Sequence, residues 1–241
     1  MIFNNKKVKE VINYCFKYYP EYTYHLDSRL TCLRYERQVA KCTEVIPKNA
    51  KVLDLGCGLG HISMILSIAR PDLDIIGIDR TKAPLWKKIK FKCKFEKGDA
   101  LNLRFKDNTF DVVISFGVME HTNNDKKFLK EIYRVLKFNG INLMFNLPNK
   151  YSMNEFFAKI LETCHENKYT KKQIKNLFLD TGFRDIEIKR ESFLPAQFNE
   201  VSRFLGNVTN KYHRLIDRID RILIKTPLNL IAEAYYITSR K

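Results

Sequence analysis

Three glycines separated by single residues, Gly56, Gly58 and Gly60, follow a short apolar run in the stretch VLDLGCGLG at residues 52–60. Residues 51–55 are typical of a buried strand, and apolar residues recur at helical spacing over 59–69, so the glycines lie on a strand-to-helix turn. Glycine accepts positive φ, its missing side chain lets a ligand touch the main chain, and the helix N-terminus presents free N–H groups. The pattern predicts a nucleotide cradle, although such turns also occur in α/β proteins that bind no nucleotide.

The spacing of this turn argues against a dinucleotide. A dinucleotide fingerprint is G-x-G-x-x-G, whose third glycine packs the helix against the strand. Here that position is His61, and the third glycine is Gly60. Asp54 would repel a pyrophosphate but suits a ligand that carries an amino group or a sulfonium. The cradle therefore favours a cation-bearing nucleoside.

Two further acids stand where later strands are expected to end. Asp79 closes the apolar run 73–79, and Asp99 follows the run 91–95 within Gly98-Asp99-Ala100. In a parallel α/β sheet the carboxyl ends of the strands form the edge at which ligands bind. A carboxylate at the end of 73–79 can accept hydrogen bonds from both hydroxyl groups of a ribose.

Two groups that could move protons follow the strand expected at 110–117. His121 titrates near neutrality and lies in the region of the expected crevice, so it is the candidate general base, and Glu120 could orient it or cap the next helix. A capping or packing role for His121 is the alternative. The six cysteines form no C-x-x-C pair and no Cys/His spacing of a zinc site, so we expect free thiols and no metal.

These groups must be positioned by strands and helices that alternate along one domain. Strands are expected at 51–55, 73–79, 91–95, 110–117, 141–147, 183–189 and 232–238. Helices are expected at 8–16, 30–46, 59–69, 84–89, 124–137 and 169–181, and a basic amphipathic segment at 200–225. The alternation predicts a doubly wound parallel sheet. The tyrosine-rich stretch 18–25 either covers a ligand or packs the first two helices on the sheet.

Charge and hydropathy bear on partners and location. The net charge is +16, and residues 80–97 hold eight Lys and Arg against one acid. This basicity favours an acidic partner, although a composition rich in Lys, Asn and Ile throughout the chain accounts for it equally well. The start shows no signal-peptide pattern and no long apolar run interrupts the chain, so we expect a soluble cytoplasmic protein or one peripheral at a membrane.

Five motifs occur in a familiar order: VLDLGCGLG, an acid ending the second strand, GDA after the third, FDVVISFGVMEH, and YRVLKFNGINLMFNLPN. Together they resemble the class I S-adenosylmethionine-dependent methyltransferases, most closely the type-11 subgroup, over residues 50–190. The resemblance implies a Rossmann-like seven-stranded sheet in the order 3-2-1-4-5-7-6 with strand seven antiparallel. It implies a helical N-terminal cap at 1–49, a cofactor-binding core at 50–190, a helical insert or lid at 191–230 between strands six and seven, and a last strand at 231–241.

The resemblance also implies which residues hold S-adenosylmethionine, with S-adenosylhomocysteine as the product. Gly56, Gly58 and Gly60 would approach the methionine part of the cofactor. Asp54 would bind its amino group directly or through water, and Asp79 would bind the ribose hydroxyl groups.

The remaining implied contacts come from other elements. Asp99 and the backbone of Ala100 would bind the adenine, and Ser115 and Phe116 would line the site below the sulfonium. Arg34 stands where related enzymes place an arginine near the cofactor carboxylate, with Arg29 and Arg37 as competitors. The segment after Asp79 is shorter and more basic than usual, and a proline usual before strand five is replaced in KFNG at 137–140.

The resemblance implies methyl transfer to an oxygen or nitrogen atom of a small-molecule, lipid-precursor or glycan acceptor. The basic regions 80–97 and 200–225 leave two other partners open, RNA and an anionic membrane surface. A non-catalytic binding protein with the same fold is a further alternative, which the intact set of glycines and acids disfavours.

Overall fold

The computed structural model describes the chain except for residues 1–5, 19–27, 84–85, 87–90, 154, 156–166 and 195–202, and the side chains of 14, 16–18 and 203–205. Residues 19–25 of the tyrosine-rich stretch and most of the helix expected at 84–89 therefore lie outside the described residues.

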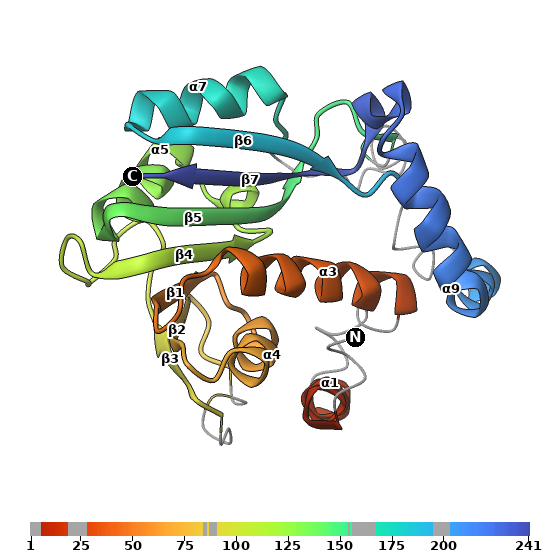
Figure 1. The fold of residues 1–241 in the computed structure, drawn as a ribbon, viewed down its shortest axis with the longest axis horizontal. Helices are drawn as coiled ribbons and strands as arrows, with labels where there is room; N and C mark the ends of the chain where they lie inside the picture. Colours follow the sequence, from red (N-terminus) through yellow and green to blue (C-terminus); the bar gives the residue numbers. More distant parts are fainter. Residues whose placement is uncertain are drawn as a thin grey trace.

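Seven strands form one sheet in the order β3-β2-β1-β4-β5-β7-β6 (Figure 1). They are β1 (Lys51–Leu55), β2 (Asp74–Asp79), β3 (Cys93–Lys97), β4 (Phe110–Phe116), β5 (Leu136–Pro148), β6 (Arg184–Glu191) and β7 (Ala234–Arg240). The first five are parallel, and β7 runs antiparallel to both β5 and β6. This confirms the predicted fold class, strand order and direction of strand seven.

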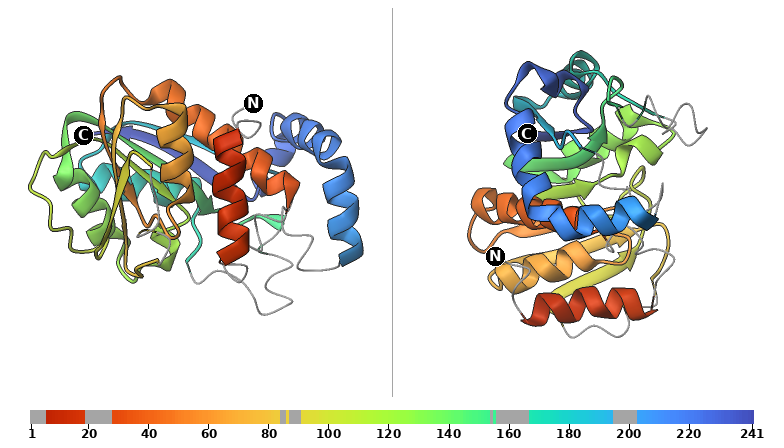
Figure 2. Two further views of the ribbon diagram at one scale, coloured as in Figure 1. Left: turned by 90° about the horizontal axis from the view of Figure 1, so that it is seen from below. Right: turned by 90° about the vertical axis from the view of Figure 1, so that its right-hand side faces the viewer.

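Helices cover both faces of the sheet (Figures 1 and 2). Helices α1 (Lys6–Tyr18), α3 (Arg29–Val45) and α4 (His61–Ala69) lie on one face, and α5 (Asp125–Val135) and α7 (Lys171–Thr181) lie on the other. Successive strand residues supply opposite cores, because side chains alternate across a strand. Val52 of β1 packs with the α1, α3 and α4 side, and Leu53 packs with the α5 and α7 side.

The described part of the segment between β6 and β7 is mostly helical, as predicted. It contains α9 (Arg203–Leu223), which bends at Tyr212, and the 3-10 helix η5 (Pro227–Ile231). A second 3-10 helix, η4 (Met119–His121), follows β4. Among the described residues, no helix is both long enough and apolar enough to cross a bilayer.

Several predicted boundaries were displaced, and the largest shift is in the strand expected at 141–147, which begins at Leu136, where it pairs with Phe110. The helix expected at 124–137 ends at Val135, where the N–H groups of Asn108 and Thr109 bond to the carbonyl oxygens of Arg134 and Val135 at 3.0 and 2.8 Å. A neighbouring loop therefore ends the helix before Gly140 is reached. The third strand begins at Cys93 rather than 91, because its register with β2 starts at the pair Ile75 and Cys93.

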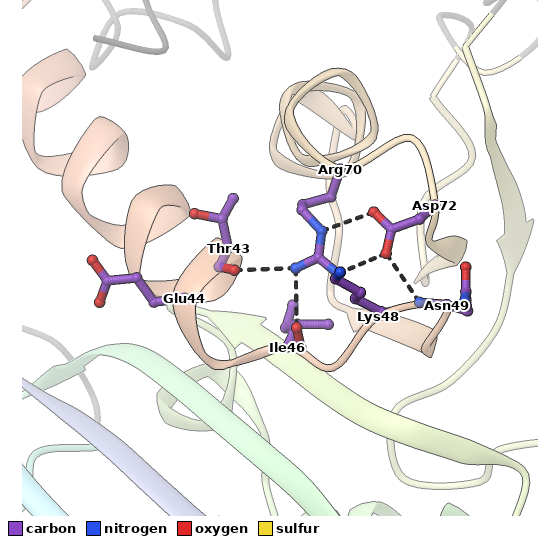
Figure 3. Close-up of a pocket in the computed structure, with 7 residues that line it drawn as sticks. All are labelled: Thr43, Glu44, Ile46, Lys48, Asn49, Arg70 and Asp72. Atoms are coloured by element: carbon purple, nitrogen blue, oxygen red, sulfur yellow. Dashed lines mark hydrogen bonds and ion pairs between the residues drawn. The ribbon is translucent and has the colours of Figure 1, made fainter.

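Arg70 links the end of α3 to the turn before β2 (Figure 3). Its Nη1 donates to the carbonyl oxygens of Thr43 and Ile46, each at 3.0 Å. Its Nη2 donates to Pro47, and Nε and Nη2 bond to the carboxylate of Asp72 at 2.8 and 2.6 Å. All five N–H groups of Arg70 thus form hydrogen bonds within the protein. The pocket that Arg70 lines together with Thr43, Ile46 and Asp72 is therefore a structural contact, which we call the Arg70 clamp.

Candidate active site

Most of the predicted cofactor residues lie at the carboxyl ends of the parallel strands. Strand β1 lies between β2 and β4, so the order of the strands along the sheet reverses beside it. In doubly wound sheets this reversal opens the crevice in which ligands bind. The glycine turn follows β1, Asp79 ends β2, and Ser115 and Phe116 end β4.

The glycine turn is held against β2 by its main chain. The N–H groups of Gly56 and Cys57 donate to the carbonyl oxygen of Ile78 at 2.8 and 2.9 Å. All three glycines have positive φ, but only Gly58 faces open space. A Cβ added to Gly56 would lie 2.4 Å from Val118, and one on Gly60 would lie 2.5 Å from the ring of Phe95, whereas one on Gly58 would meet nothing within 4 Å.

Asp79 joins the end of β2 to the exposed glycine. Its Oδ2 accepts the N–H of Gly58 at 2.9 Å, and its Oδ1 accepts the N–H of Thr81 at 2.9 Å. Each carboxylate oxygen retains further acceptor capacity. Asp99 lies exposed beyond β3, where its Oδ1 accepts the N–H of Leu101 at 2.9 Å. Ala100 is half-buried beside it.

Asp54 lies beneath the turn and is fully enclosed. The Oγ of Ser63 donates to its Oδ2 at 2.7 Å. Burial raises the pKa of Asp54 to about 7, and the negative charge of Asp79 adds to the rise while the Ser63 hydrogen bond opposes it. A cation placed nearby would favour the ionised form, which suits the predicted role toward an amino group.

The ends of β4 and β5 supply an aromatic and a polar group. Phe116 stacks on Phe145 with ring centroids 4.6 Å apart, and Phe145 stacks in turn on Tyr236. Ser115 is buried, and its Oγ has no hydrogen-bond partner among the described residues. Buried polar atoms are nearly always hydrogen-bonded, so an unpaired hydroxyl group at this edge is consistent with a ligand site.

The two candidate proton carriers differ sharply in their surroundings. His121 is exposed at the end of η4. Glu120 is buried, with Oε1 3.4 Å from where a Cβ on Gly117 would lie and no hydrogen-bond partner for Oε2 among the described residues. Burial raises the pKa of Glu120 to about 8, and the charge of Asp125 contributes. The helix after η4 is capped by Asn124, whose Oδ1 accepts the N–H of Lys127, so Glu120 does not cap it.

Arg34 lies in an ion-pair network rather than in a described contact with the glycine turn. Its Nη1 donates to Glu233 at 2.6 Å, its Nη2 donates to the carbonyl oxygen of Leu194, and Asp220 of α9 lies 3.7 Å away. These contacts join α3 to α9 and to the start of β7. The role of Arg34 toward the cofactor carboxylate stays a prediction.

Two groups of site residues were not singled out from the sequence. Trp86, the single tryptophan of the chain, donates from Nε1 to the carbonyl oxygen of Gly58 at 3.1 Å and stacks on Phe95. A lone tryptophan between an acid-ended strand and the next strand was the available signal. Gln38 of α3 donates to Asn146 at 2.6 Å and to Glu191 at 3.1 Å. That cluster joins three distant segments, so no local pattern could have shown it.

The site fits an adenosyl cofactor with a charged amino group. Gly58 leaves space where a side chain would otherwise stand, Asp79 presents carboxylate oxygens beside it, and Asp54 supplies a latent negative charge. Within the part of the chain that the structure describes, no group of His, Cys, Asp or Glu side chains is arranged to hold a metal ion. The fold and this site define a nucleoside-binding α/β protein of the methyltransferase class.

Comparisons with known proteins give the same class. A family model described as "Methyltransferase domain" matches residues 46–216. A probable S-adenosylmethionine-dependent methyltransferase of Mycobacterium tuberculosis is 24% identical over 152 residues, which cover 63% of this chain and 53% of that protein. The demethylmenaquinone methyltransferase of Thermotoga maritima is 29% identical over 197 residues, covering 72% of this chain and 83% of that protein.

A solved structure shares the fold. Phosphoethanolamine N-methyltransferase 2 of Haemonchus contortus, in complex with S-adenosyl-L-methionine, superposes with a TM-score of 0.60 at 19% identity over 85% of this chain and 51% of that one. The chain thus spans about half the length of this protein and of the mycobacterial relative. It belongs to the methyltransferase-domain family, which confirms the class I family and the cofactor, S-adenosylmethionine, predicted from the sequence, whereas the type-11 subgroup stays a prediction.

Proposed function

We propose that the protein transfers a methyl group from S-adenosylmethionine to an oxygen or nitrogen atom of a small-molecule, lipid-precursor or glycan acceptor. The observation that carries the proposal is the set formed by Asp54, Gly58 and Asp79 at the carboxyl edge of the sheet, in a chain of the methyltransferase family. A protein that had kept only the fold would have no need of a buried carboxyl group with a raised pKa beneath an open glycine.

The cofactor supplies, when bound, an electrophilic methyl group on a sulfonium. The chain's own task is to hold that group and the acceptor in line, which accounts for much of the rate enhancement in such displacements. Asp79 and the main chain at Gly58 bind the nucleoside, Asp54 neutralises the amino group, and Phe116 with Ser115 borders the reacting end. Asp99 and Ala100 bind the adenine, and Trp86 lies close enough to Gly58 to shield it.

A hydroxyl acceptor gains from a base, and Glu120 is better placed for that role than His121. Its carboxyl group is buried beside Gly117 at the end of β4, and its pKa of about 8 lies near neutrality. Because the ionised form is the base, kcat should rise with pH up to about 8 and then level off. His121, by contrast, is exposed to solvent.

The pair of variants Glu120→Gln and His121→Asn separates these roles. Glutamine keeps the shape of the buried side chain but cannot take a proton, so kcat should fall by roughly 10²-fold and lose its rise toward pH 8, with unchanged affinity for S-adenosylhomocysteine. His121→Asn should leave kcat within a few-fold of the wild type. The opposite result, a large loss in His121→Asn alone, would assign the base to the histidine.

The cluster of Gln38, Asn146 and Glu191 supports an acceptor with hydrogen-bonding groups. Asn146 lies near the carboxyl end of β5, and Glu191 is the last residue of β6. Both strands run antiparallel to β7, so these two ends lie at the same edge of the sheet as the cofactor residues. Asn146 has a φ of 61°, a conformation that costs energy in residues other than glycine and is concentrated at functional sites. Burial raises the pKa of Glu191, and its Oε2 accepts the hydrogen bond from Gln38.

RNA is the second candidate acceptor, because exposed basic side chains follow the Asp79 end of β2 and continue into β3. They include Arg80, Lys82, Lys94 and Lys97. However, β3 is the edge strand of the sheet, and lysines on an edge strand commonly prevent pairing with other chains. Binding to single-stranded RNA that falls steeply with added salt would favour this candidate, since neutralised phosphates release counterions.

A methyl-transfer assay with labelled S-adenosylmethionine tests the proposed function. Purified protein is incubated with cell extract, and the label is sorted into small-molecule, lipid, glycan, RNA and protein fractions. Label in one of the first three fractions, absent with an Asp79→Ala variant, is the expected result. Label confined to RNA would favour the second candidate, and tight cofactor binding without label in any fraction would favour a non-catalytic binding protein.

A further inference from the structure

The outward side of α9 carries an apolar stripe with no described partner. Leu215, Ile219 and Ile222 recur at spacings of four and three residues, which places them on one side of a helix. Their side chains are 43% to 64% exposed. The stripe continues past the end of the helix into η5, where Leu228 and Leu230 are equally exposed. Contiguous exposed apolar surface usually marks an interaction site.

The acids of the same helix are turned toward the protein. Asp217 pairs with Arg37 of α3 and with Arg221, which lies one turn further along α9 at 3.2 Å. Asp220 is buried, and its Oδ1 accepts the N–H groups of Phe193 and Leu194 at 2.8 and 2.7 Å. Both carboxylates are therefore used to fix α9 to α3 and to the end of β6.

The lysine and arginine side chains of α9 that the structure describes remain on the outer surface. They are Lys211, Arg214, Arg218 and Arg221 on the helix and Lys225 just after it, and all are exposed. Arg214, Arg218 and Arg221 each precede a residue of the apolar stripe, so their charges run along one flank of it. The outward face of α9 thus combines apolar side chains with positive charge, whereas the carboxylates of Asp217 and Asp220 lie on the side of the helix that faces the protein.

We propose that this outer face of α9, together with η5, docks on the surface of an anionic lipid bilayer. An amphipathic helix with Lys and Arg beside its apolar side lies in the plane of the interface, bound by apolar burial and by attraction to acidic headgroups. A second copy of the chain is disfavoured as occupant, because two such faces would bring like-charged flanks together in a chain of net charge +16.

The position of α9 gives this docking a consequence for the site. The helix lies beside the end of the sheet at which β4 and β5 terminate (Figures 1 and 2). The same end holds the cofactor residues. Docking would bring the open edge of the site near the membrane surface, where an acceptor with an apolar tail is concentrated.

Co-sedimentation with vesicles tests the proposal without any methyl donor, so its outcome is independent of the proposed function. Wild-type protein should sediment with vesicles containing phosphatidylglycerol and remain in solution with pure phosphatidylcholine. Ile219→Gln with Ile222→Gln removes the apolar side chains and keeps the charge, and Arg214→Gln with Arg218→Gln does the reverse. Each pair should weaken binding roughly tenfold or more.

The matched control is Lys172→Gln with Lys175→Gln, which removes the same charge from exposed positions of α7. It should bind like the wild type, and cooperative thermal unfolding shows that every variant is folded. Equal losses in the control and the Arg pair would show that net charge alone attracts the vesicles and would overturn the proposal. So would failure to bind anionic vesicles, or a wild-type dimer in sedimentation equilibrium that the isoleucine pair dissolves.

Discussion

Asp54 shows how one buried carboxyl group can make cofactor binding depend on pH. Its pKa rises from 3.8 to about 7, chiefly through burial. Between pH 3.8 and about 7, the folded protein therefore keeps a proton that the unfolded chain releases. The stability contributed by the protonated form is lost as pH rises through this range. A ligand carrying an ammonium group binds the ionised form and recovers part of this loss.

The affinity for S-adenosylhomocysteine should therefore rise with pH until about 7 and then level off. Asp54→Asn should remove this dependence and weaken binding roughly tenfold or more, while leaving the protein at least as stable as the wild type above neutrality. Fluorescence of Trp86, the single tryptophan, provides the titration signal beside Gly58. An affinity in the wild type that does not change across this pH range would refute the assignment.

Gly58 can be separated from its neighbours because only its side-chain position is open. Gly58→Leu should weaken S-adenosylhomocysteine binding roughly tenfold or more, since the new side chain takes the ligand's space. The positive φ of 52° adds a folding cost of about 1–2 kcal/mol. Binding is measured by the same fluorescence titration.

Gly182→Leu is the matched control for that strain, because Gly182 also has positive φ but ends α7, away from the site. It should lose stability and keep cofactor affinity. Gly60→Leu would instead push into the ring of Phe95 and disturb the fold. Wild-type affinity in folded Gly58→Leu would show that the turn does not face the cofactor.

At the scale of elements, the sequence predicted most of what positions the site. The apolar runs and the glycine turn were sufficient for β1, β2, β4 and α4. The helix expected at 169–181 was also found close to its predicted bounds, because local residues end it: a capping box at Thr170 and a left-handed Gly182. These features are local, so a short window contains their causes. The end of α5 depended on hydrogen bonds from Asn108 and Thr109, which no window around Val135 contains.

The site residues likewise fall into those that local sequence predicts and those that depend on distant contacts. Asp54, Gly58 and Asp79 follow directly from strand ends and were predicted, whereas Trp86 and the cluster of Gln38, Asn146 and Glu191 depend on contacts between distant segments. The burial of Glu120 and the exposure of His121 are the basis for proposing the glutamate as the base. Nothing in the dipeptide Glu120-His121 indicates which of the two side chains turns inward.

The Arg70 clamp should contribute measurably to stability. Arg70→Met should lower Tm by on the order of 5 °C, because it leaves the carbonyl oxygens of Thr43, Ile46 and Pro47 without their donor. Arg104→Met is the control, since Arg104 forms an exposed ion pair with Glu96. Such pairs contribute little, so its Tm should stay near that of the wild type. Equal Tm values for the two variants would contradict the clamp.

The clamp should also weaken in acid. The hydrogen bonds that Arg70 donates to Asp72 hold the pKa of this carboxyl group well below its ordinary value of 3.8. The stabilisation is thus fully present above the unfolded pKa and is lost as pH falls through the folded one. The Tm difference between wild type and Arg70→Met should shrink at low pH.

At the scale of the whole molecule, the last strand in the sequence lies inside the sheet rather than at its edge. Strand β7 lies between β5 and β6 and pairs with both. A chain that ends at residue 231 should therefore lose cooperative thermal unfolding and expose the edges of two strands, which bind other chains readily. Removal of Lys241 alone is the control and should preserve cooperativity. Cooperative unfolding of the shortened chain near the wild-type Tm would contradict this.

The same placement of β7 imposes an order on synthesis. Strands β1 to β5 and the whole glycine turn leave the ribosome early and can pair among themselves. Among the described strands β6 pairs with β7 alone, so β6 cannot join the sheet until residues 234–240 emerge. Long-range pairing of this kind is slow and leaves apolar surface uncovered in the meantime. Before residues 234–240 emerge, the nascent chain thus has a nearly complete cofactor cradle, an open sheet edge and an exposed cationic amphipathic helix.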